Sequence, residues 1–240
     1  MEIIPAIDLK GGRVVRLIQG DPGRETRYSD DPAAVAREWE RRGAQRLHLV
    51  DLDGALGGSP ANQEALAQIF RAIRVPAQLG GGLRSLDAVR AALDLGASIA
   101  IVGTAAIRDG WFLEAVCAAF PGRVALGLDA RGGRLATSGW TEATALRALE
   151  LARRVNDLSL AAIIYTDIQR DGMLEGPDLE GLAEIVSATR IPVIASGGIS
   201  SVTDIRALRT LTPRVAGAII GKALYDGRLT LEAALAAARD

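Results

Sequence analysis

Eight short apolar runs recur along the chain at intervals of roughly thirty residues, and each precedes a segment with the periodicity of an amphipathic helix. The runs are Glu2–Ile7, Arg46–Val50, Ala77–Leu79, Ser98–Val102, Val124–Leu128, Ala161–Tyr165, Pro192–Ala195 and Ala216–Ile220. Their continuous apolarity indicates strands of a parallel sheet that are buried on both faces. Eight strand–helix units in 240 residues favour an α/β protein with one closed (β/α)8 barrel, a TIM barrel. A doubly wound open sheet is the alternative.

The segments between the runs carry helix signals. Amphipathic spacing predicts helices over Ala33–Arg42, Ala65–Ile73, Leu86–Leu95, Ala143–Arg154, Leu179–Ala188 and Leu231–Ala238. Asp31 before Pro32 predicts an N-cap followed by proline at the first helical position. Ser201 and Asp204 have the spacing of a capping box, which predicts a helix start there.

The two halves of the chain resemble each other. Residues 4–13 (IPAIDLKGGR) match residues 125–134 (ALGLDARGGR), an offset of 125 − 4 = 121. Gly81 and Gly82 match Gly197 and Gly198 at an offset of 116, and a third match pairs Gly103 with Gly221 at an offset of 118. Three matches in the same order predict two similar half-barrels, over about residues 1–122 and 123–240, within one domain.

Asp8 and Asp129 are related by this repeat, and each follows an apolar run directly. Active residues of a (β/α)8 barrel lie at the carboxyl ends of the strands, and the first and fifth strands face each other across the barrel. The alternative is that each carboxylate caps a loop or pairs with an arginine. Two facing carboxylates suit general acid–base catalysis if one of them has a raised pKa. The sequence leaves open which one that is.

Glycine clusters form a second pair of repeated features. Gly81, Gly82, Gly103 and Thr104 follow the third and fourth runs, and Ser196, Gly197, Gly198, Gly221 and Lys222 follow the seventh and eighth. Glycines at such turns let backbone N–H groups approach an anion, as in the phosphate sites of many barrels. The alternative is a set of tight turns that only need positive φ. Two phosphate sites with two carboxylates between them predict an elongated substrate that is phosphorylated at both ends.

Three connections are long for a barrel. Gln19–Asp30, Ala130–Thr141 and Asp167–Asp178 are expected to be mobile lids at the mouth. Trp140 lies in one of them, outside any apolar periodicity. Its indole either stacks on a flat ring of a ligand or packs against its own loop.

Composition excludes several classes of function. Lys+Arg 28 and Asp+Glu 29 leave a net charge of −1, so no global basic field is available for nucleic acid or an anionic membrane. The one cysteine, Cys117, excludes an internal disulfide, and the one histidine, His48, argues against a histidine-rich metal site or a Ser-His-Asp triad. Neither a membrane span nor a signal peptide is recognisable. We expect a cytoplasmic monomer whose partner is a small molecule.

Motifs along the whole chain resemble one family. They are residues 3–9 (IIPAIDL), 14–17 (VVRL), 50–55 (VDLDGA), 78–82 (QLGGG), 102–105 (VGTA), 127–129 (GLD), 138–140 (SGW), 166–172 (TDIQRDG) and 195–198 (ASGG). In this order they are similar to the phosphoribosyl isomerase of histidine biosynthesis. The resemblance implies an intramolecular oxidoreductase that converts ProFAR, an aminoaldose with two phosphoribosyl arms, into the aminoketose PRFAR by an Amadori rearrangement.

The resemblance also implies roles for individual residues. Asp129 would protonate the ring oxygen to open the ribose, and Asp8 would take the proton from C2 of the resulting Schiff base. Thr166 would hold the substrate near the reacting carbons, Asp171 would lie on the closing loop, and Arg16 would help to fix the active conformation. Neither a cofactor nor a metal is implied.

Three other functions are alternatives. A bifunctional relative also isomerises phosphoribosyl anthranilate and carries an arginine before its Gly-Trp pair, where this chain has Ser138. Serine lacks the guanidinium fork that would bind the anthranilate carboxylate, so a single activity is expected unless Arg131 or Arg134 substitutes. The cyclase subunit of imidazole glycerol phosphate synthase usually has a cysteine where this chain has Ala6. The third alternative is a barrel that binds phosphosugars without catalysis.

Some polar residues have simpler interpretations. His48 is expected to be packed or hydrogen-bonded within its strand, and Cys117 to be a small buried hydrophobic residue. Asp51 and Asp53 either contact substrate or order the neighbouring loops. At the last glycine cluster, the backbone of Gly221 is a better phosphate ligand than the Lys222 side chain.

Overall fold

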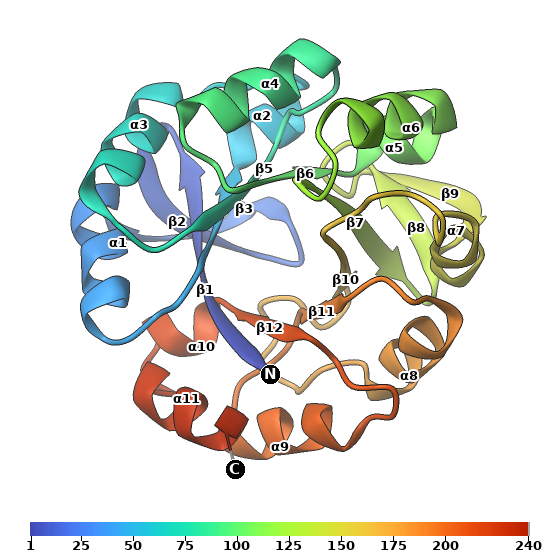
Figure 1. Cartoon of the computed structure of the whole chain (residues 1–240). Coiled ribbons are helices and arrows are strands. Elements are labelled where there is room, and N and C mark those ends of the chain that lie inside the picture. Colours follow the sequence, from blue (N-terminus) through green and yellow to red (C-terminus); the bar gives the residue numbers. More distant parts are fainter. Residues whose placement is uncertain (240) are drawn as a thin grey trace.

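A computed structural model describes residues 1–239 and has eight parallel strands that close into a barrel (Figure 1). In ring order they are β1 (Glu2–Lys10), β4 (Leu47–Asp51), β5 (Ala77–Gly80), β6 (Ile99–Val102), β7 (Val124–Arg131), β10 (Ala162–Asp167), β11 (Val193–Ser196) and β12 (Gly217–Ile220). The ring closes through the pairings β1–β12 and β7–β10. Each of the eight apolar runs is one of these strands, so the predicted barrel is confirmed.

Helices surround the ring of strands (Figure 1). They are α1 (Pro32–Arg41), α2 (Leu52–Gly57), α3 (Gln63–Ala72), α4 (Leu86–Leu95), α5 (Thr104–Arg108), α6 (Gly110–Ala119), α7 (Ala148–Arg154), α8 (Leu179–Ala188), α9 (Val202–Thr210), α10 (Lys222–Tyr225) and α11 (Leu231–Arg239). Asp31 caps α1 by accepting a hydrogen bond from the Ala34 N–H, and Ser201 and Asp204 form the predicted capping box of α9. Among residues 1–239 no helix has the length and apolarity needed to cross a bilayer.

Two of the expected loops are antiparallel hairpins instead. β2 (Arg13–Ile18) pairs with β3 (Asp21–Ser29) after β1, and β8 (Arg134–Thr137) pairs with β9 (Glu142–Arg147) after β7. Gln19–Asp30 is therefore largely strand, Ala130–Thr141 consists of strand residues and turns in equal parts, and the helix expected from Ala143 begins only at Ala148. In β9 the pairing with β8 outweighs helix propensity. The third expected loop, 167–178, is irregular.

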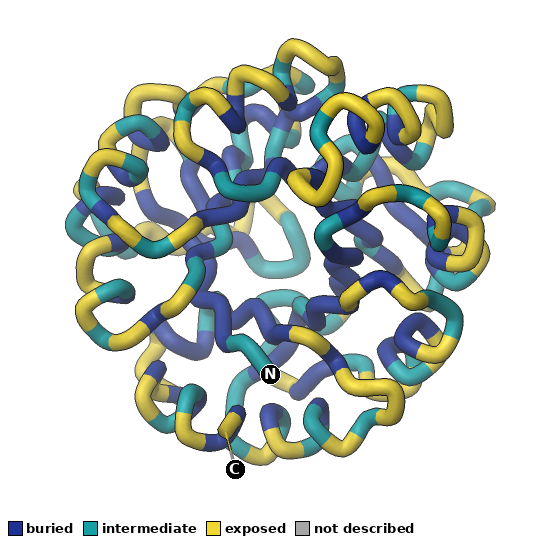
Figure 2. The backbone as a smooth tube through the Cα atoms, viewed as in Figure 1, coloured by how far each residue is buried: buried dark blue, intermediate teal, exposed yellow. Residues whose placement is uncertain are grey.

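The strands separate two apolar layers, because successive side chains point to opposite faces. Side chains such as Ile3, Leu49 and Leu126 pack against the helices in the larger cluster. The smaller cluster fills the inside of the barrel and consists of Ile4, Ala6, Ala125, Ala162, Ile164, Ile194 and Ile219. Burial is accordingly concentrated along the strands, while the outer sides of the helices are exposed (Figure 2). This small inner core leaves room for polar side chains at the carboxyl ends of the strands.

Candidate active site

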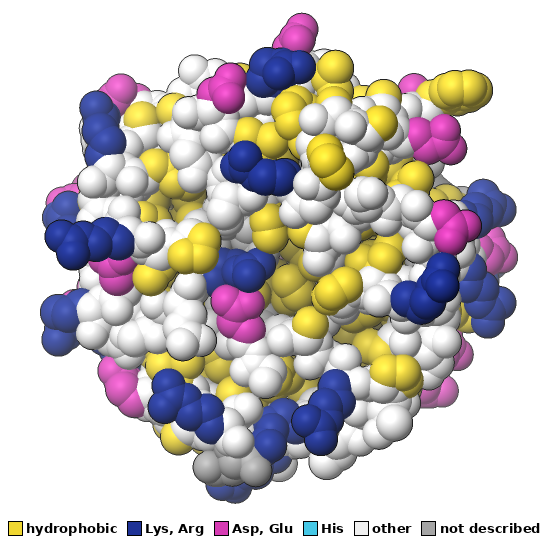
Figure 3. All heavy atoms as spheres, in the orientation of Figure 1, with side chains coloured by type: hydrophobic (Ala, Val, Ile, Leu, Met, Phe, Trp, Pro, Cys, Tyr) yellow, Lys and Arg dark blue, Asp and Glu magenta, His cyan; other side chains and the backbone are white. Residues whose placement is uncertain are grey.

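The residues that the sequence singled out lie around one cavity at the carboxyl ends of the strands. Its lining includes Asp8, Arg16, Gly81, Gly82, Gly103, Thr104, Asp129, Trp140, Thr166, Asp171, Ser196, Gly197, Gly198, Gly221 and Lys222. They come from all parts of the chain, and the barrel brings them together. On the opposite face, where the chain's N-terminus lies, charged side chains of both signs are mixed, with no large patch of one sign (Figure 3).

Asp8 is held by an arginine from the neighbouring strand. Asp8 on β1 is paired in register with Val15 on β2, and the next residue, Arg16, donates from Nη1 to Asp8 Oδ2 at 2.6 Å. Arg16 Nη2 donates to the Ala6 carbonyl oxygen at 2.9 Å, and its guanidinium lies 5.4 Å from the centre of the Tyr225 ring. Burial raises the pKa of Asp8, and the Arg16 charge and hydrogen bond oppose that rise.

Asp129 has a different electrostatic environment. It lies on β7, four strands from β1 in the ring of eight, and its register partner on β10 is Thr166. Burial raises the pKa of Asp129, and the opposing hydrogen bonds come from Trp140 and Thr166, which carry no charge. A cation thus favours the ionised form of Asp8, and no charged group does so for Asp129.

Asp171 is a third carboxyl group in the cavity. Burial, together with the charges of Asp8 and Asp129, raises its pKa to about 7, although Arg16 opposes the shift. Its main chain is attached to the turn of the β2–β3 hairpin, because the Gln19 N–H donates to the Asp171 carbonyl oxygen at 3.1 Å. Gln19 Nε2 also donates to the Gln169 carbonyl oxygen at 2.7 Å. The hairpin and the 167–178 loop therefore close over the cavity together.

The glycine clusters have matching backbone conformations in the two halves. Gly81 and Gly197 have φ angles of 106° and 94°, and those of Gly82 and Gly198 are 74° and 77°. A Cβ atom at Gly81 would lie 2.1 Å from the Asp51 carbonyl oxygen, so only glycine fits this turn. The tight turn therefore explains why glycine is required at this position, and the same turn brings the backbone to the edge of the cavity.

Gly103 and Gly221 form the second part of each cluster. They are the N-cap residues of α5 and α10, with similar φ and ψ values of −126° and −93° for Gly103 and −109° and −101° for Gly221. Neither helix start has a side-chain cap among the described residues, so N–H groups are free to bind an anion. Lys222 forms an ion pair with Asp226, which leaves the backbone of Gly221 as the main candidate ligand.

Trp140 comes from the β8–β9 connection and crosses the mouth of the cavity. It has a φ of 71°, and its ring packs so closely on Gly20 that a Cβ atom there would lie 2.5 Å from Trp140 Cε3. The indole therefore contacts the β2–β3 hairpin, rather than packing only on its own loop.

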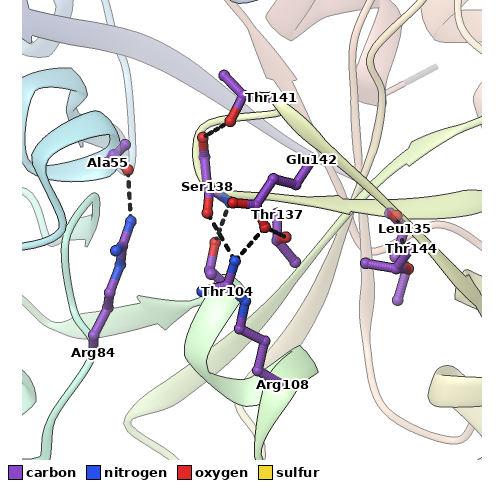
Figure 4. A network of polar contacts seen from close by, with 10 residues as sticks. All are labelled: Ala55, Arg84, Thr104, Arg108, Leu135, Thr137, Ser138, Thr141, Glu142 and Thr144. Atoms are coloured by element: carbon purple, nitrogen blue, oxygen red, sulfur yellow. Dashed lines mark hydrogen bonds and ion pairs between the residues drawn. The ribbon is translucent and has the colours of Figure 1, made fainter.

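Polar contacts hold the β8–β9 hairpin against α5 (Figure 4). The Ser138 N–H donates to Thr104 Oγ1 at 2.9 Å, and Arg108 Nη2 donates to Ser138 Oγ at 3.0 Å and to the Glu142 carboxylate. The cavity lining does not include Ser138, Arg131 or Arg134. The suggestion that Arg131 or Arg134 could supply a guanidinium inside the site is therefore not supported.

Asp51 and Asp53 order the loops and do not reach the cavity. The Asp51 carboxylate accepts hydrogen bonds from the Gly54 and Ala61 N–H groups and from Asn62 Nδ2, and Asp53 accepts one from the Gly11 N–H at 2.7 Å. Asn62 links these loops, and no sequence motif pointed to it. Cys117 is buried, as expected.

Arg84 and His48 are polar residues of the cavity lining that the sequence analysis did not place in the site. Arg84 donates from Nη2 to the Ala55 carbonyl oxygen at 2.9 Å. Its position two residues after the glycine cluster was a usable signal. His48 is hydrogen-bonded to Gln78, in line with the expectation that it is packed or hydrogen-bonded, and it also lines the cavity. Across residues 1–239 no group of three or more His, Cys, Asp or Glu side chains is arranged to hold a metal ion.

Comparison with known proteins gives matches along nearly the whole chain. The family model described as "Histidine biosynthesis protein" matches residues 2–230. Relatives include a protein of Synechococcus sp. strain JA-2-3B'a(2-13), 54% identical over 99% of this chain and 90% of its own length. One of Syntrophus aciditrophicus strain SB is 50% identical over 100% and 99% of the two chains. Both are named 1-(5-phosphoribosyl)-5-((5-phosphoribosylamino)methylideneamino)imidazole-4-carboxamide isomerase.

Proposed function

The chain belongs to the histidine biosynthesis protein family, and from this premise we propose that it is the aldose–ketose isomerase that converts ProFAR into PRFAR. ProFAR is the imidazole-4-carboxamide compound in the relatives' name, and PRFAR is its aminoketose isomer. The observation that carries the proposal is the pair of carboxyl groups, Asp8 and Asp129, which line one cavity but differ in their charged neighbours.

The two glycine clusters suit the two ends of this substrate. Gly81, Gly82 and Gly103 line one side of the cavity, and Gly197 and Gly198 belong to the matching cluster on the other. Each presents backbone N–H groups where a phosphate would bind. A substrate with a phosphoribosyl group at each end would span the mouth of the barrel and place its central sugar carbons between the two carboxyl groups.

The reaction needs one acid and one base. Asp129, with a raised pKa and no cationic partner, would protonate the ribose ring oxygen, which breaks the C1–O bond and leaves a Schiff base at C1. Asp8, whose ionised form is favoured by the Arg16 charge and hydrogen bond, would then take the proton from C2. The C1–C2 bond gains double-bond character, a proton returns at C1, and the C2 hydroxyl becomes a ketone. Atoms balance, since the product is an isomer.

Thr166 and Asp171 complete the proposed site. Thr166 is the register partner of Asp129 on the neighbouring strand, so its hydroxyl would orient the acid. Asp171 lies on the loop that is joined to the β2–β3 hairpin, and that loop would hold its carboxyl group in the site beside the substrate. Trp140 lies at the mouth, where its indole would stack on the imidazole ring.

The geometry favours a single activity. No arginine of the β8–β9 hairpin lines the cavity, and the Ser138 hydroxyl is occupied by Arg108. The anthranilate carboxylate would therefore find no guanidinium fork from this hairpin.

The test is turnover by the purified protein with ProFAR and phosphoribosyl anthranilate offered separately. We expect conversion of ProFAR and none of the anthranilate. Conversion of both would contradict the single activity. Binding of ProFAR without conversion would contradict the catalytic role and favour a phosphosugar-binding barrel.

A further inference from the structure

His48 and Gln78 form a polar pair inside the barrel. They are register partners on the neighbouring strands β4 and β5, and His48 is also the register partner of Ala6 on β1. Their strand neighbours Leu47, Leu49 and Leu79 belong to the apolar layer beneath the helices, so the two side chains point inwards. They therefore lie one layer deeper than Asp8, next to the small inner core.

One hydrogen bond determines the tautomer of His48. Gln78 Nε2 lies 2.8 Å from His48 Nδ1. An amide nitrogen can only donate, so Nδ1 accepts and the imidazole proton is on Nε2. Burial and the charge of Arg16 lower the pKa of His48 to about 3, so the ring is neutral at physiological pH.

The protonated nitrogen is open to the cavity. His48 is part of the cavity lining, and its Nε2 has no hydrogen-bond partner among the described residues. That nitrogen is also absent from the fully buried unpaired atoms of residues 1–239, so it has accessible surface. The floor of the cavity around it is made of apolar residues such as Ala6, Ile164 and Ile219. His48 thus offers one N–H donor at the centre of an otherwise apolar floor.

We propose that Gln78 is a positioning residue that holds His48 as the neutral Nε2–H tautomer, a hydrogen-bond donor to an oxygen atom of the sugar chain between the two phosphates. This inference rests on the proposed function. Asp8 and Asp129 exchange protons with the sugar carbons and the ring oxygen. A neutral imidazole donates a hydrogen bond without giving up its proton. Such a donor can orient a hydroxyl group or the developing ketone of the substrate.

The energetics of Gln78 argue against a purely structural role. Its side chain is fully buried, and its Oε1 has no partner in the part of the chain that the structure describes. A buried amide with an unpaired oxygen destabilises the fold relative to an apolar side chain of the same shape. Gln78→Met should therefore keep or raise the Tm and still lower activity.

The tautomer is measured directly by NMR. His48 is the only histidine of the chain, so selective labelling of the imidazole nitrogens gives signals that need no assignment. We expect a protonated Nε2 and an unprotonated Nδ1 from about pH 5 to about pH 8. In Gln78→Met we expect loss of this single state, seen as averaging of the two nitrogen signals. A proton on Nδ1 in the unaltered protein would overturn the proposal, because the amide would then accept rather than donate.

Kinetics supply the second readout. With ProFAR as substrate, Gln78→Met should lower kcat/KM about tenfold, the effect of one neutral hydrogen bond. His48→Leu should lose at least as much, whereas His48→Gln, which keeps an N–H donor near the position of Nε2, should retain most of the activity. Gln68→Met, the same change at an exposed position on α3, is the control and should change nothing.

The two proposals fail in different ways. If the unaltered protein does not convert ProFAR, the proposed function fails while the NMR result still decides the tautomer. If ProFAR is converted normally by Gln78→Met with an unchanged histidine spectrum, the positioning role of Gln78 is wrong and the isomerase stands. Equal losses in His48→Leu and His48→Gln would contradict the donor role of His48.

Discussion

Arg16 is the residue that distinguishes the two carboxyl groups of the site. It donates to Asp8 at 2.6 Å and has no counterpart at Asp129, whose hydrogen bonds come from uncharged groups. Burial raises the pKa of both aspartates, but only Asp8 has a cation that favours its ionised form. This difference supports the proposed roles of Asp8 as base and Asp129 as acid.

The pH profile should change when Arg16 is replaced. Arg16→Met removes the charge that opposes the rise in the Asp8 pKa, so Asp8 will stay protonated to higher pH. We expect the acidic limb of the kcat/KM profile to move to higher pH, with a loss of about a hundredfold at neutral pH. Arg16→Lys keeps the charge, so the acidic limb of its kcat/KM profile should lie close to the pH at which the unaltered protein has it. An unmoved limb in Arg16→Met would show that Asp8 is not the base.

Gly221→Ala and Gly103→Ala are a matched pair of substitutions that test the contact between Arg16 and Asp8, because only the first would disturb Arg16. Both glycines have negative φ, but a Cβ atom at Gly221 would lie 2.2 Å from Arg16 Nη2, whereas at Gly103 the nearest atom is 3.8 Å away. Gly221→Ala should displace the guanidinium and move the acidic limb upwards, as Arg16→Met does. Gly103→Ala should crowd a phosphate and raise KM without moving the limb. A limb that moves equally in both variants would refute this explanation.

Asp171 should make stability depend on pH. Its pKa is raised from 3.8 to about 7, so between these values the folded state binds more protons than the unfolded state and stability falls as pH rises. Asp171→Asn should therefore increase the free energy of unfolding at pH 8 by at most ~4 kcal/mol, and the gain should vanish below about pH 4. Urea unfolding at both pH values measures this. Asp157→Asn, at a side chain that is 93% exposed, is the control. An equal gain in the free energy of unfolding at both pH values would contradict the coupling between Asp171 protonation and stability.

At the scale of elements, two hairpins and one loop cover the site. The turn of β2–β3 is bound to the 167–178 loop through Gln19 and meets Trp140 from β8–β9 at Gly20. The second hairpin is in turn held to α5 by Thr104, Arg108 and Glu142 (Figure 4). The covering elements therefore support one another across the mouth of the barrel.

The Arg108–Glu142 ion pair should affect binding more than stability. Both side chains are about half exposed, so their coupling in a double-mutant cycle should be only ~0.5 kcal/mol. Arg108→Met should nevertheless raise the KM for ProFAR about fivefold, because Trp140 is less well held, while kcat changes little. Arg190→Met, which breaks the exposed Arg190–Asp157 pair outside the cavity, should leave KM unchanged. An equal rise of KM in both variants would exclude a specific role of the α5 contact.

At the scale of the whole molecule, the barrel could be predicted because its strands are continuous apolar runs. The two glycine clusters could be recognised because they repeat in the sequence, and the structure gives their glycines matching backbone conformations. The β2–β3 hairpin could not be predicted from the sequence, since residues 21–27 are all exposed and show no alternation of apolar and polar residues. The charge states of the aspartates depend on contacts between β1 and β2 that only the folded register creates. The buried Gln78 was not singled out because it lies within the apolar run Ala77–Leu79, and its partner His48 comes from another strand.

The central claim is that Asp129 is the acid and Asp8 the base of one isomerisation. The most direct test is single-turnover conversion of ProFAR by the unaltered protein and by Asp8→Asn and Asp129→Asn, with folding checked by thermal unfolding. We predict that each substitution slows the chemical step about a thousandfold while ProFAR still binds. Conversion at an undiminished rate by either folded variant would contradict the account.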